Sequence, residues 1–411
     1  MAVLRRSLNA LRDARFESQL DANMRILPFD NGLYDLDARA FRRMRWDDYV
    51  STTIGYSYSE TPDVADVELV DRFFEQVFPV EEERELVLRM AGSTLGGAPV
   101  NKRFLVLQDH RGGDNGKSMV LQAFLAALGR FSLANQNQFL SVASRPDPNG
   151  HQANTLAYKG KRLAVFDETD PSVRFDLAKM KAITGGSTTI AVRGANEATV
   201  TEFRWTAFLM IACNKGCLPS IDSSDAAFLN RMVTVPMRSK FNDAAAAAGT
   251  PLSFPMDNNL QEKLRNARQA IVQVLIRAYG RYEDAGRSFG ELPASCLELR
   301  ASIVSDSDPR VELVNTVIDR VVDFRPIAQG PEVPAVRFVE RADILEEVSK
   351  SDKDNVTKKV KKCVMKDIVD AAMAARGHPP EERVKVNGKG FYNVYKDCSR
   401  RVKTEGERGE N

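Results

Sequence analysis

Residues 110–129 read HRGGDNGKSMVLQAFLAALG, and this stretch decides the fold class. The apolar run RFLVLQ precedes it at residues 103–108 and has the composition of a buried strand. A glycine-rich turn follows, and SMVLQAFLAALG then has helical character. A strand, a glycine-rich loop and a helix in this order are typical of a loop that cradles phosphate groups. We therefore expect an α/β fold built around a nucleotide site.

The glycine-rich loop departs at one position from the common pattern G-x-x-x-x-G-K-[ST], because Arg111 stands where the first glycine belongs. The part that touches phosphate is intact. Lys117 is placed to neutralise the β- and γ-phosphates, and the Ser118 hydroxyl to bind Mg²⁺. A surface turn is the plainer interpretation, which the strand and the helix around the loop disfavour. We expect six consecutive residues to hold ATP: Gly113, Asp114, Asn115, Gly116, Lys117 and Ser118.

An acidic pair ends a second apolar run, KRLAVFDETD at residues 161–170. One carboxylate at the end of such a strand can hold Mg²⁺, and its neighbour can orient the attacking water. We assign the metal to Asp167, together with Ser118, and the role of general base to Glu168. An acidic pair after a strand is often only a solvated loop. Its position downstream of a phosphate loop favours a hydrolytic site.

Two further apolar runs each place a polar residue at one end. WTAFLMIACNKG, residues 205–216, delivers Asn214, whose amide can hydrogen-bond the γ-phosphate or the attacking water. DAAFLNRMVTVPM, residues 225–237, has Arg231 just before a strand. Arg231 could enter a neighbouring subunit's site as an arginine finger. The plainer alternatives are a residue that begins a turn and a surface arginine beside a strand.

The rest of the chain bounds its class. Its 58 basic and 56 acidic residues nearly balance, so any surface for nucleic acid must be local. Cys213 and Cys217 are the only close cysteines, and no second pair completes a zinc site. The start resembles neither a secretory signal nor a transit peptide, and no apolar run of membrane-spanning length exists. We expect an intracellular protein without membrane contact, in the host cytoplasm or nucleus if viral and in the bacterial cytoplasm if from a phage.

Taken together, the motifs resemble the superfamily 3 helicases of the AAA+ class, and more narrowly the helicase part of poxvirus-type helicase-primases of viruses and phages. NGKS, VFDE, KAITGG and ACN stand where that family has its motifs A, B, B′ and C. FDNGLYDLDARAFRRMRWDDYVSTTIGYSYSE is similar to the domain that leads into these ATPases. The family often has two arginines near the finger and an acidic residue after KAITGG. Here the finger is the single Arg231, and Ser187 holds the second place.

The resemblance and the patterning together predict five segments. Residues 1–95 form a mainly helical lead-in domain, 96–245 the AAA+ P-loop ATPase core and 256–330 a helical lid. Residues 335–403 form a winged-helix-like domain, because a helical stripe ending near Gly377 is followed by two strand-like runs around Asn387–Gly388. Residues 404–411 are expected to be a disordered tail.

Single-stranded DNA is the partner that the resemblance implies for the segment 177–203, LAKMKAITGGSTTIAVRGANEATVTEF. Lys179, Lys181 and Arg193 are the residues we expect to contact its backbone. A lysine-bearing helix followed by an ordinary hairpin remains the alternative. The basic run KKVKK at residues 358–362, with Lys385 and Lys389, suits either duplex phosphates or a solvated helix face.

We therefore expect an ATP- and Mg²⁺-dependent DNA helicase that works as a ring, with a hexamer as the expected size, on single-stranded and forked DNA. The alternative is a P-loop ATPase that binds or packages nucleic acid without unwinding it. A small-molecule kinase is disfavoured, since it needs neither a water-activating glutamate nor an arginine from a neighbour. Too few residues precede the loop for a primase domain, so we expect either a primase on another chain or a longer protein of which this sequence is one part.

Overall fold

The computed structural model describes residues 16, 19–97, 101–109, 112–141, 153–167, 175–186, 188–193, 200–215, 217–218, 225–307, 309–323, 338–352, 357, 362–374, 376–386, 389–396 and 398–400. The chain divides into two compact units. The first comprises Met1–Pro219 and Ala226–Ala301, and the second comprises Ser220–Asp225 and Ser302–Asn411. No helix among the described residues is long and apolar enough to cross a membrane.

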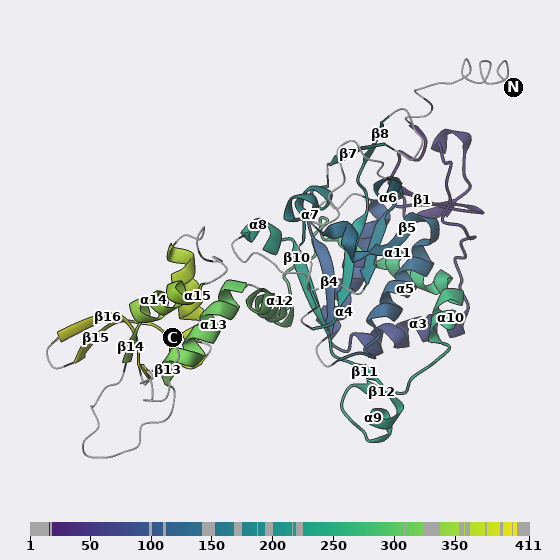
Figure 1. Ribbon diagram of the computed structural model, residues 1–411. Helices are drawn as coiled ribbons and strands as arrows, with labels where there is room; N and C mark the ends of the chain where they lie inside the picture. The colour runs from purple at the N-terminus through teal and green to yellow at the C-terminus, as the bar shows by residue number, and fades with distance from the viewer. Residues whose placement is uncertain are drawn as a thin grey trace. The chain divides into compact units, whose positions relative to one another are not determined.

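A five-stranded parallel sheet forms the centre of the first unit (Figure 1). Its strand order is β10-β4-β9-β6-β5. The bounds are Phe104–Asp109 for β4, Ser132–Gln136 for β5, Leu163–Asp167 for β6, Phe208–Cys213 for β9 and Met232–Met237 for β10. The three central strands and β10 are apolar without alternation, because both faces of a parallel sheet are covered. The expected α/β class is confirmed, and all neighbouring strands of the central sheet pair parallel.

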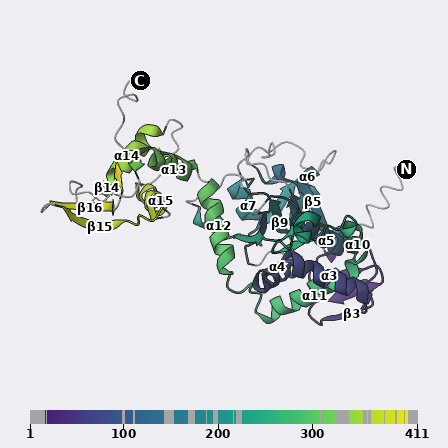
Figure 2. The same ribbon diagram turned by 90° about the horizontal axis from the view of Figure 1, so that it is seen from below.

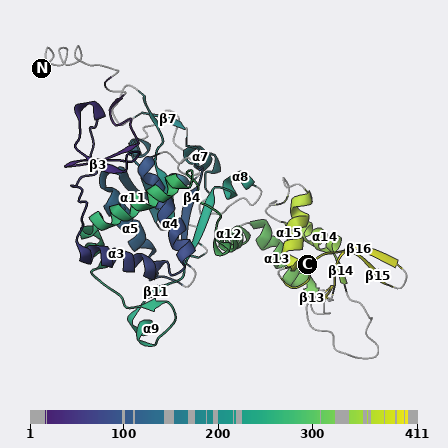
Figure 3. The same cartoon turned by 180° about the vertical axis from the view of Figure 1, so that it is seen from behind.

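Four long helices of the first unit cover one face of this sheet, while Phe228 of the short helix α8 (Ala226–Leu229) packs on Phe104 of β4. Leu105 and Leu107 of β4 share a hydrophobic core with α5 (Lys117–Leu128), α3 (Val64–Val77), α4 (Glu81–Ser93) and α11 (Arg268–Asp284). Figures 2 and 3 show α3, α4 and α11 grouped around α5. Helix α10 (Leu260–Asn266) also packs on α5. The lead-in segment, the central sheet and the helices that follow it therefore share one hydrophobic core.

The N-terminal segment contains a small antiparallel sheet as well as helices. Strands β1 (Ile26–Phe29), β2 (Gly32–Asp35) and β3 (Ala40–Arg42) pair in sequence order. Two residues, Asp30 and Asn31, connect the first pair, a length that suits a tight hairpin. The lead-in was expected to be mainly helical, and the sheet is the part that helical periodicity did not indicate. The 3-10 helices η1 (Trp46–Asp48) and η2 (Thr94–Gly96) flank the region.

The remaining elements of the first unit are short. They are η3 (Gly129–Phe131), η4 (Asn137–Leu140), α6 (Ala153–Leu156), α7 (Leu177–Ile183), α8 (Ala226–Leu229), β11 (Lys240–Phe241), α9 (Asp243–Ala247) and β12 (Ser253–Phe254). Strands β7 (Thr189–Val192) and β8 (Thr201–Arg204) pair antiparallel outside the central sheet. They form the hairpin expected for the segment after α7.

The second unit combines three helices with small antiparallel sheets. Helix α12 (Ala294–Ser307) crosses the division between the units. The second unit then has α13 (Pro309–Val321), α14 (Arg341–Ser351) and α15 (Lys362–Ala374), which share a core with Tyr395. Strands β14 (Phe338–Glu340), β15 (Glu381–Val386) and β16 (Lys389–Lys396) form a sheet in the order β14-β16-β15. Strands β13 (Val322–Asp323) and β17 (Ser399–Arg400) form a second pair.

A helix followed by a hairpin is thus present at α15, β15 and β16, as the sequence predicted. The segment expected as a lid, residues 256–330, is divided between the two units after Ala301. Residues 358–361 of the basic run, the side chains of Lys385 and Lys389, and the tail 404–411 lie outside the described part of the chain.

Candidate nucleotide site

The loop between β4 and α5 has an unusual backbone path. Gly112, Gly113, Asp114 and Gly116 all have positive φ values, of 79°, 48°, 52° and 83°. Left-handed residues in a tight turn rotate successive N–H groups toward one side, which forms a concave site for an anion. Helix α5 begins directly after this turn and adds the positive end of its dipole. The loop can therefore hold phosphate groups, while Arg111 lies outside the described residues.

The Lys117 ammonium joins the ends of two strands. Its Nζ donates to the Asn214 Oδ1 atom, 2.7 Å away, and lies 3.8 Å from the Asp109 Oδ2 atom. Asp109 ends β4, and Asn214 follows β9, the neighbouring strand. Lys117 itself is buried. A buried ammonium between a carboxylate and an amide is held in position for a further anion.

The Ser118 hydroxyl meets the end of a third strand. Its Oγ donates to the Asp167 Oδ2 atom at 3.0 Å, although the two residues are 49 positions apart. Asp167 ends β6, which lies beside β9 in the sheet. A hydroxyl and a carboxylate are ligands that Mg²⁺ takes together with phosphate oxygens and water. The arrangement fits a nucleotide-bound Mg²⁺, and within the described residues no group of three or more acidic, histidine or cysteine side chains could hold a metal alone. Glu168 lies outside the described part.

Arg231 stands at the opposite edge of the same sheet. It immediately precedes β10, whose first residue pairs with the first residue of β4. Its guanidinium donates to the Thr184 Oγ1 atom at 2.8 Å and to the Lys181 carbonyl. Since a six-residue strand spans about 17 Å, Arg231 cannot reach the phosphate loop of its own chain. The sequence order agrees with this separation, since Arg231 precedes its apolar run whereas Asp167 and Asn214 lie at the ends of theirs.

The three residues expected to contact DNA have different surroundings. Lys179 donates to the Phe139 carbonyl at 2.6 Å, its ammonium lies 3.4 Å from the Phe139 ring centroid, and burial lowers its pKa to about 8. Lys181 is half-buried near the end of α7. Arg193 is exposed directly after β7. Arg193 is thus the one open to solvent, whereas the Lys179 ammonium is engaged inside the protein.

Several residues that contact the phosphate loop were not indicated by any sequence motif. Lys240 donates to the Gly112 and Gly113 carbonyls at 2.7 and 3.2 Å, and the Phe241 N–H donates to the Asp114 carbonyl at 2.6 Å. A pocket of about 260 Å³ adjoins the loop. Apolar side chains line it together with the loop: Phe73, Met119, Phe241, Met256 and Leu260. Asp109, the last residue of its strand, is the one that strand-end position alone could have indicated.

Comparisons with known proteins find one matching family model and several viral relatives. Residues 2–79 match the family described as D5 N terminal like. The chain is 28% identical over 292 residues to "Putative helicase L207/L206" of Acanthamoeba polyphaga mimivirus, a match that covers 69% of this chain and 30% of that protein. It is also 28% identical to "Putative helicase 184R" of Invertebrate iridescent virus 6, covering 66% of this chain and 28% of the relative.

The chain therefore spans about a third or less of the length of these relatives. Among solved structures, the apo structure of the NrS-1 C terminal region matches with a TM-score of 0.47 and 11% identity, covering 84% of this chain and 77% of that one. The matching relatives are viral, and the N-terminal match precedes the phosphate loop. Over about two thirds of its length, the chain is similar to viral proteins that are named putative helicases.

Proposed function

We propose that this chain is an ATP-dependent DNA helicase of superfamily 3, with an AAA+ core, that acts as a hexameric ring on single-stranded DNA during viral or phage DNA replication. The observation that carries the proposal is the convergence of Lys117, Ser118, Asp167 and Asn214 at one edge of a parallel sheet. The viral relatives support the same activity by their names.

ATP in this proposal lies on the loop, with its base toward the apolar pocket beside Phe73 and Phe241. The Lys117 ammonium would exchange part of its hydrogen bonding to Asn214 for the phosphates and neutralise their charge, while Ser118 and Asp167 would hold Mg²⁺. When bound, Mg²⁺ stabilises the charge that develops on the transferred phosphoryl group. Asn214 would then orient the attacking water, and Glu168 would take its proton.

Arg231 supports sites that are shared between subunits. Because it lies at the far edge of the sheet from its own loop, its charge could act only on the nucleotide of a neighbour. A head-to-tail contact of this kind generates a ring when the rotation between subunits closes, which is the assembly we propose. Its hydrogen bonds to Lys181 and Thr184 connect the finger to α7, next to the hairpin that would grip DNA.

DNA contacts in the proposal come from Arg193 on the β7–β8 hairpin and from Lys181. Lys179 would hold η4 in place at Phe139, since its ammonium is already engaged there. The basic run of the winged-helix-like second unit suits either duplex phosphates or a solvated helix face, and forked-DNA affinity after deletion of residues 335–411 would distinguish the two. A primase, in this scheme, resides on another chain or on a further part of a longer protein.

The test measures ATP hydrolysis with and without single-stranded DNA for the wild type, Lys117→Ala and Arg231→Ala. Each variant alone should lose DNA-stimulated activity, the second by about 10³-fold or more. Mixing the two inactive variants in equal amounts should restore about a quarter of the sites, because a Lys117 from one subunit then meets an Arg231 from the next. Mixtures that stay inactive would refute shared sites.

Unwinding of a forked duplex separates the helicase from its main rival. The rival is a P-loop ATPase that binds or packages nucleic acid without separating strands. Strand separation that requires ATP and fails in Lys117→Ala would support the helicase. DNA-stimulated hydrolysis without any strand separation would favour the rival.

A further inference from the structure

A second and larger pocket lies in the first unit, away from the phosphate loop. It has a volume of about 1220 Å³ and is lined by the lead-in segment, by β8 and by the end of α11. Phe131, Arg162 and Thr206 also line it, and they precede β5, β6 and β9. The pocket therefore opens at the amino-terminal edge of the sheet, opposite the carboxyl-terminal edge that carries Lys117.

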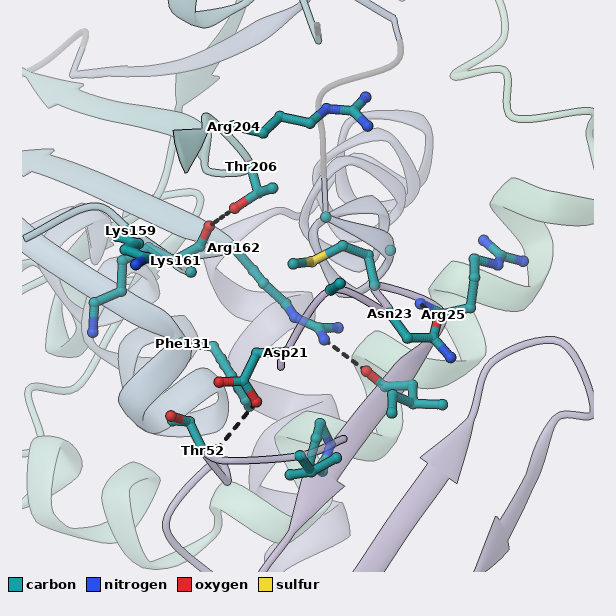
Figure 4. Close-up of a pocket in the computed structure, with 18 of the residues that line it drawn as sticks. Asp21, Asn23, Arg25, Thr52, Phe131, Lys159, Lys161, Arg162, Arg204 and Thr206 are labelled. Carbon is teal, nitrogen blue, oxygen red and sulfur yellow. Dashed lines mark hydrogen bonds between the residues drawn. The ribbon is translucent and has the colours of Figure 1, made fainter. Parts of the chain in front are cut away.

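Basic side chains outnumber acidic ones in the lining of this pocket. Figure 4 shows Arg25 on the lead-in side and Lys159, Lys161, Arg162 and Arg204 on the core side. Arg130 and Arg287 complete the basic set of seven, against three acidic residues, Asp21, Glu202 and Glu283. A cavity with this excess of positive charge favours a polyanionic ligand.

Two of the three carboxylates are already engaged. The Asp21 carboxylate accepts hydrogen bonds from the backbone N–H groups of Ser51 and Thr52, at 2.7 and 3.3 Å. Glu283 accepts from Arg25 at 2.7 Å and from Arg287 at 3.1 Å. Within the described part of the chain, neither carboxylate forms an ion pair with the basic side chains on the core side of the pocket.

Five cations in the lining lack an ion pair with any described carboxylate. Lys161 donates to the Arg130 carbonyl at 2.6 Å, and Arg204 to the Gly186 carbonyl at 2.6 Å. Arg162 is almost fully buried, donates to the Ile26 carbonyl at 2.6 Å, and has a buried Nε atom without a described partner. Burial lowers the pKa of Arg162 to about 10 and that of Lys161 below its usual range. The remaining two are Arg130 and Lys159, whose side chains are exposed.

We infer that this pocket binds the sugar-phosphate backbone of a single DNA strand that continues from the β7–β8 hairpin. The inference deepens the proposed function and rests on it. Strand β8 connects the two places, because Arg204 lines the pocket and pairs with Thr189 at one end of the hairpin, whereas Arg193 follows β7 at the other. About 10 Å of strand separates the two ends, so one DNA strand could contact both arginines.

The lining favours a phosphate backbone over other anions. The volume exceeds the range of about 300–1,000 Å³ that is usual for small-ligand sites, so a single nucleotide would leave much of it empty. The aromatic residues Phe131, Phe203, Tyr279 and Tyr282 are all buried in their own packing, so they offer little open ring surface for stacked bases. Recognition by charge alone predicts binding without sequence preference.

The experiment measures binding of fluorescent oligo-dT by anisotropy over a series of salt concentrations. The test protein is the full chain with Arg130→Ala and Lys159→Ala combined, and the control is Arg265→Ala, an exposed arginine on α10 outside the pocket. The double variant should bind about tenfold more weakly at moderate salt, and the slope of log affinity against log salt should fall by about 1.4, or 0.7 per lost phosphate contact. Arg265→Ala should match the wild type in both quantities.

Each other outcome has a distinct meaning. A double variant with wild-type affinity and slope would overturn the pocket while leaving the proposed function intact. A loss of log affinity in Arg265→Ala that is half or more of that in the double variant would also overturn it, since the net charge removed would then explain both effects. Unchanged oligo-dT binding with lost binding of polyglutamate would assign the pocket to an acidic peptide. A wild type that fails to bind oligo-dT would refute the proposed function together with the inference. Both mutated side chains are exposed, and an unchanged urea midpoint checks that the variant folds.

Discussion

Replacement of Gly116 by alanine should destabilise the first unit more than the same replacement of Gly113. Both glycines lie in the phosphate loop with positive φ, of 83° and 48°. A Cβ atom at Gly116 would lie 2.9 Å from the Val77 Cγ2 atom and 3.2 Å from the Phe241 Cε2 atom. A Cβ atom at Gly113 would have no described atom within 4 Å. The two variants therefore share the backbone strain and differ in the steric contact.

The difference between the two variants isolates that contact. A left-handed alanine costs about 1–2 kcal/mol relative to its preferred conformation, and this cost applies at both positions. The loss of unfolded-state freedom stabilises both variants by about 0.4–1 kcal/mol and also cancels. Overpacking against Val77 adds about 1–3 kcal/mol at Gly116 alone. Gly116→Ala should therefore be about 1–3 kcal/mol less stable than Gly113→Ala.

Tryptophan fluorescence during urea unfolding, without nucleotide, measures this difference. The chain has two tryptophans, Trp46 and the buried Trp205, and both belong to the first unit, so the signal reports that unit. In a Val77→Ala background the extra cost of Gly116→Ala should largely disappear, because the close atom is gone. Equal free energies of unfolding for Gly116→Ala and Gly113→Ala would refute the contact between α3 and the loop.

Other contacts make three further predictions testable. Asp167→Asn should lower ATP hydrolysis by about 100-fold and shift the Mg²⁺ titration to higher concentrations, whereas unchanged Mg²⁺ dependence would remove Asp167 from the metal site. Gly92→Ala should lower the free energy of unfolding, measured in urea, by about 1–3 kcal/mol, since its Cβ atom would lie 2.7 Å from the backbone of α11. Gly280→Ala on that helix should raise it by up to about 1 kcal/mol, because its Cβ atom would have no described atom closer than 3.9 Å. Burial lowers the pKa of Lys179 from 10.5 to about 8, so the native state binds fewer protons than the unfolded state between pH 8 and 10.5. The free energy of unfolding should therefore rise with pH in this range, and Lys179→Met should make that rise smaller.

Local patterns predicted the parts of the site that depend on strand ends. Asp167 and Asn214 each follow a buried apolar run, and the carboxyl ends of parallel strands meet at one edge of a sheet. Their approach to Ser118 and Lys117 follows from that rule once the strands are recognised. The catalytic roles given to them remain predictions.

Contacts between distant segments could not be predicted in this way. Nothing in the sequence places Val77 against Gly116, or the Arg162 guanidinium against the Ile26 carbonyl, because these contacts depend on how the lead-in packs on the core. The positions of Lys240 and of the basic pocket likewise depend on contacts between segments that are distant in the sequence. Side chains that act across segments carry no fixed spacing, so periodicity and motif order cannot find them.

The parallel sheet places the candidate nucleotide site and the basic pocket at opposite edges. All five strands run in one direction, so every strand contributes one end to each edge. The carboxyl-terminal edge carries Lys117, Asp167 and Asn214, while Arg231 and Arg162 lie at the amino-terminal edge. The length of a strand of buried residues separates the two edges, so side chains at one edge do not contact those at the other directly. Coupling between the two edges would therefore pass through the packed elements of the unit or through a neighbouring chain. Arg231 belongs to both routes in our proposal, because it is bonded to Lys181 and Thr184 of the α7 region and is proposed to act on a neighbour's nucleotide.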